Sequence, residues 1–199
     1  MDQARRLFLA TAAASSLWPL QATAQDRYAT EPAVAWLEDV LASKSLSGPV
    51  ALSRFADPMY YLLEPFTWTP NPDNDPVFHG VTVPKGFITD LASIPPPLFP
   101  LLRPDGDYAQ AAIVHDYLYW FQTTSKDYAD QVFKIAMRDL EVDPVTIAML
   151  YAGVSVGGGP AWDQNRKLRE RGEKRILKSF PTKASTRWAE WKAKADVFE

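Results

Sequence analysis

Small and apolar side chains recur at helical spacing in two neighbouring segments near the middle of the chain. Residues 111–119 and residues 128–137 each repeat such side chains every three or four positions, which is the period of one face of an α-helix. The polar run 122–125 separates the two segments. This pattern predicts two helices joined by a short turn, a helical hairpin with buried inner faces.

Shorter apolar runs precede this hairpin and predict strands. They are rich in Val, Leu, Tyr and Phe, and turns with proline and aspartate separate them. The predicted strands are residues 49–55, 59–66, 77–83 and 87–91. Residues 70–76 contain three prolines and predict a loop. Prolines at 95–97 and 100 predict a rigid extended connector to the hairpin, because proline fixes φ and disfavours helix in the residue before it.

Further helices are predicted at residues 32–41, 143–156, 161–177 and 184–197. Asp143 before Pro144 is typical of a helix N-cap, and the glycines before Pro160 predict a hinge. Trp188 and Trp191 lie one turn apart and indicate that the last helix docks on the rest of the protein. The expected fold is α+β: a small antiparallel sheet packed beside a helical bundle, with the motifs in residues 49–140 and a helical extension in 143–199.

Composition narrows the class of protein. The chain has 199 residues, of which 47% are hydrophobic, and a formal net charge of −3; this suits a globular domain and gives no basic field for nucleic acid. Basic residues do gather at 166–178, but glutamates between them favour a solvated helix face. The absence of cysteine excludes thiolate catalysis and cysteine-ligated zinc.

The N-terminus has the features of an export signal. Arg5 and Arg6 precede an apolar stretch, and small residues at 22–24 suit signal peptidase. The paired arginines resemble a twin-arginine signal; ordinary secretion and an uncleaved anchor are the alternatives. We therefore expect a signal peptide at 1–24, a single domain at 25–199, a periplasmic or secreted location and no stable transmembrane span after cleavage.

The first predicted helix places a histidine beside a carboxylate on an apolar segment. His115 and Tyr119 are four residues apart and share a face, and Asp130 on the second helix falls on the side that faces them. A carboxylate held against one imidazole nitrogen leaves the other free to accept a proton from water, as in a general base. Asp116, rotated by about 100°, can ligate a metal. The alternative is a hydrogen-bonded core histidine.

Several separated motifs resemble one family found in bacteria and phages. Residues 83–95 (VPKGFITDLASIP), Tyr108, residues 111–119 (AAIVHDYLY) and Ala129 with Asp130 occur in the order seen in the family catalogued as domain of unknown function 1353. The resemblance covers residues 81–137 and implies a phage-related or bacterial domain. It implies no activity.

Residues 111–119 are also similar to the active-site helix of phospholipases A2, in which a His-Asp pair is followed by tyrosine. This resemblance implies that His115 is the base, Asp116 a Ca²⁺ ligand, Tyr119 a hydrogen-bonding support and Asp130 the residue that orients His115. It also implies a lipid or ester substrate. The chain lacks the cysteines of the secreted enzymes, and only residues 103–107 (RPDGD) stand where their calcium loop would be.

Asp90 is a further candidate because it follows a predicted strand, where site carboxylates often lie. It can ligate the metal beside Asp116, or it can cap a turn. With His79 and His115 it would form a zinc site of the kind used by cell-wall peptidases. Three hypotheses therefore remain: a metal-assisted hydrolase of an ester or lipid, a non-catalytic cell-envelope or phage-derived structural module, and a zinc-dependent peptidase.

Overall fold

The computed structural model of the chain describes residues 49–91 and 108–199. Both ranges lie within the second of two compact units of the chain, residues 39–199. The predicted signal peptide, the predicted helix at 32–41, the proline-rich connector and the turn at 103–107 lie outside the described residues. Among the helices of the described ranges, none combines the length and the apolar character needed to cross a membrane.

The strands are short and antiparallel, and they form two small sheets. The order β1-β2-β5 makes up one sheet, and β3 pairs with β4 in the other. The strands are β1 Leu52–Arg54, β2 Tyr60–Leu62, β3 Phe66–Trp68, β4 Val81–Val83 and β5 Ile88–Thr89. The predicted strand at 59–66 is therefore two strands, because the turn at residues 63–65 ends in Pro65, which has no N–H to donate to a ladder. The predicted strand at 77–83 begins only at Val81, so His79 precedes the strand.

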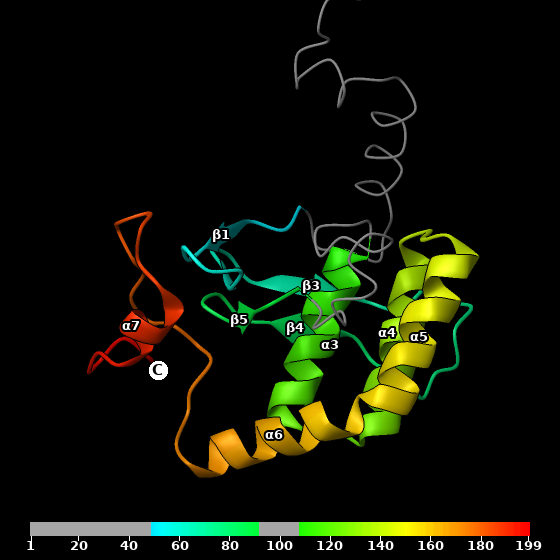
Figure 1. The fold of residues 1–199 in the computed structure, drawn as a ribbon. Coiled ribbons are helices and arrows are strands. Elements are labelled where there is room, and N and C mark those ends of the chain that lie inside the picture. The colour runs from blue at the N-terminus through cyan, green and yellow to red at the C-terminus, as the bar shows by residue number, and fades with distance from the viewer. Residues whose placement is uncertain (1–48, 92–107) are drawn as a thin grey trace, which may run out of the picture. The chain divides into compact units, whose positions relative to one another are not determined.

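Two helices joined by residues 122–125 confirm the predicted hairpin. Helix α3 spans Ala109–Phe121 and helix α4 spans Lys126–Asp139, and they pack against each other (Figure 1). The Ser125 hydroxyl accepts a hydrogen bond from the Tyr128 amide at 3.1 Å, which caps α4. The apolar inner face of each helix is buried, as the periodicity predicts.

Helix α5, Pro144–Gly157, begins where the sequence predicts. The Asp143 carboxylate accepts hydrogen bonds from the amides of Val145 and Thr146. Helix α6, Gly159–Glu170, follows after Gly158, so the glycine run joins two helices. Helices α4 and α5 lie side by side, and α6 contacts both α3 and α5 (Figure 1).

The C-terminal region differs from the prediction. Helix α6 ends at Glu170, not at 177, and only Trp188–Lys192 (α7) is helical within 184–197. Ile176 instead pairs with Phe87, and Leu177 pairs with Phe198. Gly86, at φ +81°, allows this pairing, since a Cβ there would lie 2.2 Å from the Leu177 carbonyl oxygen.

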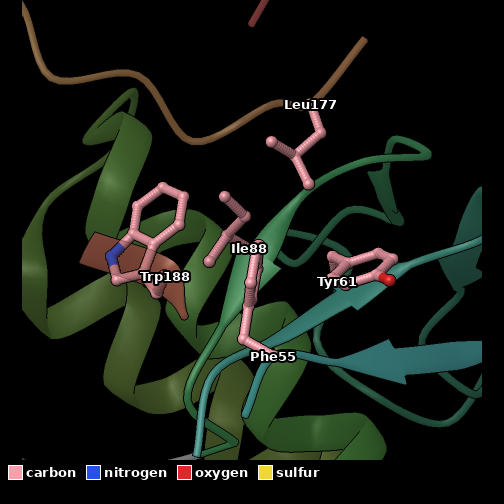
Figure 2. Packing of buried hydrophobic residues seen from close by; sticks show 5 residues of the cluster. All are labelled: Phe55, Tyr61, Ile88, Leu177 and Trp188. Carbon is pink, nitrogen blue, oxygen red and sulfur yellow. The ribbon is translucent and has the colours of Figure 1, made fainter. Parts of the chain in front are cut away.

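This return of the chain closes a core over the three-stranded sheet. Trp188 of α7 packs on Phe55, with ring centroids 5.5 Å apart, which confirms the predicted docking of the last helix. Figure 2 shows the cluster, which contains Phe55, Tyr61, Ile88, Leu177 and Trp188. Small antiparallel sheets and several packed helices make the fold α+β, as predicted.

Candidate active site

The helical hairpin brings the predicted histidine and carboxylate together. His115 Nε2 of α3 lies 3.3 Å from Asp130 Oδ1 of α4. Both side chains are buried, at 6% and 2% exposure. Because an ionised carboxylate can only accept, Nε2 bears the proton and Nδ1 has the lone pair. No hydrogen-bond partner of Nδ1 is found within residues 49–91 and 108–199.

Two further groups hold the Asp130 carboxylate. The Tyr119 hydroxyl donates to Oδ1 at 2.7 Å, and the Lys126 ammonium donates to Oδ2 at 2.7 Å. Burial alone would raise the pKa of Asp130, but the hydrogen bonds from His115, Lys126 and Tyr119 together hold that pKa below its usual value. Asp130 is therefore ionised when His115 is neutral.

The imidazole of His115 is enclosed by aromatic rings. Tyr119 and Phe133 lie with ring centroids 4.0 and 4.7 Å from it. Burial lowers the pKa of His115, and the opposing effect of Asp130 is too small to restore it. A neutral imidazole with a free lone pair is the form that accepts a proton at neutral pH.

Asp90 and Asp116 are two further carboxyl groups near His115. Burial and the neighbouring Asp90 raise the pKa of Asp116 well above its usual value. A carboxyl group with a raised pKa keeps its proton to a higher pH. Asp116 is therefore able to donate a proton.

A strained turn holds this pair in place. The Thr89 hydroxyl donates to Asp116 Oδ2 and accepts from the Leu91 amide. Leu91 adopts φ 61°, which is rare for a residue with a bulky side chain. Thr89 thus connects the turn that contains Asp90 to helix α3.

One cavity joins the two halves of the site. It has a volume of about 390 Å³, and His115, Asp116 and Asp90 line it together. Asp130 does not line it and lies behind the imidazole. The other lining residues come from β5, α3, α4, α5, α6 and the segment after α6: Phe87, Ile88, Thr89, Tyr119, Trp120, Phe133, Met149, Leu150, Gly153, Val154, Gly157, Gly158, Ala161, Gln164, Asn165, Leu168 and Arg175.

Arg175 is the cavity residue that the sequence interpretation missed. The charge pattern at 166–178 predicts a place on a solvated helix face, but Arg175 lies beyond the end of α6 at Glu170. The Arg175 carbonyl accepts from the Ile88 amide at 2.9 Å, so pairing with β5 brings the residue to the cavity. Its guanidinium lies 4.6 Å from the Trp120 ring centroid and 3.0 Å from Glu173. The position of Arg175 at the cavity follows from the pairing of its segment with β5, which the local sequence does not predict.

Gly158 sits against the Asp130 network. A Cβ at this position would lie 2.4 Å from the Tyr119 hydroxyl and 3.1 Å from Lys126 Cε. Lys126 also donates to the Val154 carbonyl at 2.9 Å, near the end of α5. The predicted hinge is thus the point at which the α5–α6 corner contacts the groups that hold Asp130.

The described residues do not form a ready metal centre. Within them no group of three or more His, Cys, Asp or Glu side chains is arranged to hold an ion. Asp90 and Asp116 supply two carboxyl groups, whereas calcium needs about six to eight oxygen ligands. His79 is exposed and does not line the cavity that contains Asp90 and His115, so the three residues of the predicted zinc set are not brought together.

Comparison with known families agrees with the resemblance noted in the sequence. Residues 62–154 match the family described as protein of unknown function (DUF1353). This part of the chain belongs to that family. The match includes all five candidate residues, Asp90, His115, Asp116, Tyr119 and Asp130. No curated protein and no solved structure matched the chain, so the similarity to phospholipases A2 stays a resemblance of one helix.

Proposed function

We propose that the protein is a hydrolase of carboxylic esters, with lipid esters of the cell envelope as candidate substrates. One observation supports this above all: a single cavity contains an imidazole backed by an ionised carboxylate and, beside it, Asp116, whose carboxyl group has a raised pKa. These are a base and an acid, the two groups that hydrolysis of an ester requires at neutral pH. The proposed location is the periplasm or the exterior, from the predicted signal at 1–24.

In the proposed reaction His115 Nδ1 takes a proton from water as the water oxygen attacks the ester carbonyl. Asp130 accepts from Nε2 and favours the resulting imidazolium, so it is a positioning residue. Tyr119 supports Asp130 through its 2.7 Å hydrogen bond. Arg175 lines the same cavity, and its guanidinium can stabilise negative charge on the carbonyl oxygen.

The carboxyl pair completes the proposed cycle. When the tetrahedral intermediate collapses, Asp116 gives its proton to the departing alkoxide, which leaves as an alcohol. The imidazolium of His115 then returns a proton to the carboxyl pair through water. No step of this proposal passes through a metal; the calcium and zinc expectations remain predictions, tested by adding each ion to chelator-treated protein.

The decisive experiment measures hydrolysis of 4-nitrophenyl butyrate and of phospholipid vesicles. His115→Gln keeps an N–H donor for Asp130 but removes the basic nitrogen, so we expect a loss of about 100-fold or more with a melting temperature close to that of the native protein. His79→Gln is the matched control, since His79 lies outside the cavity.

The pH profile adds a second test of the roles. The rate rises with pH as His115 loses its proton, below the usual imidazole value of about 6.5, because burial lowers its pKa. It falls again as Asp116 loses its proton, at a higher pH than is usual for a carboxyl group because burial and Asp90 raise its pKa.

The structural module is the alternative that one observation favours. Asp130 is satisfied by three donors from α3 and α4, as expected of a buried polar link between two helices. If His115→Gln unfolds the protein and no ester is hydrolysed by the native chain, this alternative replaces the hydrolase.

A further inference from the structure

The cavity has a polar end and an apolar wall. His115, Asp116, Asp90 and Arg175 gather at the polar end. The wall comes from α5 and α6 and holds no charged side chain among its lining residues, which are Met149, Leu150, Gly153, Val154, Gly157, Ala161, Gln164, Asn165 and Leu168. A ligand that fills such a cavity has a polar group at one end and an apolar part at the other.

Gly153 is the unusual residue in this wall. It lies inside α5, Pro144–Gly157, where glycine is the least favourable residue after proline. A Cβ at Gly153 would meet no atom within 4 Å, and its φ is not positive. Neither close packing nor backbone conformation therefore requires glycine at this position.

Gly153 belongs to a row of residues along the cavity. Met149, Gly153 and Gly157 follow one another at four-residue spacing, which places them on one helix face, and all three line the cavity. A Cβ at Gly157 would also meet nothing within 4 Å. The missing side chains leave this part of the wall as bare backbone.

A separate observation places a hydrogen-bond acceptor in the same cavity. His115 lines it, and no hydrogen bond to its Nδ1 is found in the part of the chain that the structure describes. The lone pair of Nδ1 is therefore available to a ligand in the cavity. The open wall and this nitrogen face one space of about 390 Å³, within the range of about 300–1,000 Å³ for small-molecule sites.

We propose that Gly153 and Gly157 keep the α5 wall open for an aliphatic chain of the substrate, and that Gly153 limits the length of chain that fits. The inference rests on the proposed function, because it places the reacting ester at His115. Each methylene buried on binding contributes about fourfold in affinity, so an ester with a longer chain is expected to be the better substrate.

The test compares 4-nitrophenyl acetate with 4-nitrophenyl octanoate. We expect the native protein to have a kcat/KM at least tenfold higher for octanoate, and Gly153→Leu to reduce the octanoate-to-acetate ratio at least tenfold. Gly153→Ala should reduce it less and melt at the same temperature or higher, which shows that the fold tolerates a side chain at this position. Ala152→Leu is the matched control, because Ala152 is exposed and does not line the cavity.

A binding measurement separates this inference from the hydrolase. Calorimetry with 1-octanol on His115→Gln protein, with and without Gly153→Leu, needs no turnover. If no ester is hydrolysed but 1-octanol binds and Gly153→Leu weakens it at least tenfold, the aliphatic site stands and the hydrolase fails. If esters are hydrolysed and Gly153→Leu leaves both the ratio and 1-octanol binding unchanged, the inference is wrong. Absence of 1-octanol binding together with no preference for octanoate also overturns it.

Discussion

Asp130 and Asp116 are two aspartates of one site, and their pKa values are shifted in opposite directions. Asp130 is the more buried, at 2% exposure, yet its pKa lies below the usual value because three side chains donate to it. Asp116 is only half-buried, yet burial and the facing Asp90 raise its pKa well above that value. Burial raises the pKa of both and is the largest cause at Asp116, whereas the three donors outweigh it at Asp130.

The difference explains how one cavity can hold an acid and a base. Donors such as Tyr119 and Lys126 favour the ionised form of a carboxyl group, whereas a second carboxyl group disfavours it. Separation of two pKa values in this way is common at sites of acid–base chemistry. The three predictions below change Asp130, the packing against its partner Tyr119, and Asp116.

The largest effect is expected from Asp130→Ala. Removing this carboxylate leaves His115 and the Lys126 ammonium, which has only 19% of its side chain exposed, without their shared partner. Loss of one member of a buried ion pair costs about 3 to 5 kcal/mol, measured by denaturant unfolding. Asp127→Ala, on the exposed side of the same helix, should cost less than about 1 kcal/mol. Equal effects of the two changes would refute the role given to Asp130.

A smaller effect is expected from Gly158→Ala. The added Cβ would lie 2.4 Å from the Tyr119 hydroxyl, so Tyr119 must shift from Asp130 or the α5–α6 corner must move. Overpacking of this kind costs about 1 to 3 kcal/mol. Gly159→Ala is a close control, since its Cβ meets nothing within 4 Å; we expect a change within about 0.5 kcal/mol. If thermal unfolding does not separate the two variants, Gly158 does not buttress the network.

The smallest effect is expected from Asp116→Asn and depends on pH. Because burial and Asp90 raise the pKa of Asp116 in the folded protein, its contribution to stability is full below about pH 4 and is lost as pH rises through the raised value. Asparagine does not titrate, and its amide can donate to Asp90. The variant should melt a few °C higher than the native protein at pH 7 and show a smaller difference at pH 4. A difference that does not change with pH would contradict the raised pKa of Asp116.

Local periodicity was sufficient to predict the helical hairpin but not the C-terminal region. His115, Tyr119 and Asp130 lie on the faces of α3 and α4 that the three- and four-residue spacing predicts, because that spacing is a property of the helix itself. Residues 161–177 also have a helical composition. In the structure, however, Ile176 pairs with Phe87 and Leu177 pairs with Phe198. Such pairing depends on which strand edge is open, and local sequence does not specify this.

The candidate site also has parts that the sequence predicts and parts that only the tertiary structure shows. The position of Asp90 after a strand makes it a candidate metal ligand beside Asp116, but its effect on the pKa of Asp116 follows only from the tertiary structure. Thr89 donates a hydrogen bond to Asp116, which is 27 positions later in the chain. Arg175 reaches the cavity only because its carbonyl accepts a hydrogen bond from the Ile88 amide. A Cβ would meet nothing within 4 Å at Gly153 but would lie 2.4 Å from the Tyr119 hydroxyl at Gly158, a difference that the sequence does not indicate.

By itself, the sequence determined the hairpin, the burial of its inner faces and the meeting of His115 with Asp130, since these follow from helix geometry over a few turns. The tertiary structure decided which carboxyl group is ionised and which is protonated, where Arg175 lies, and that a cavity exists at all. The physical reason is that a pKa and a void depend on every group within a few ångströms, and in a folded chain most of those groups are distant in sequence.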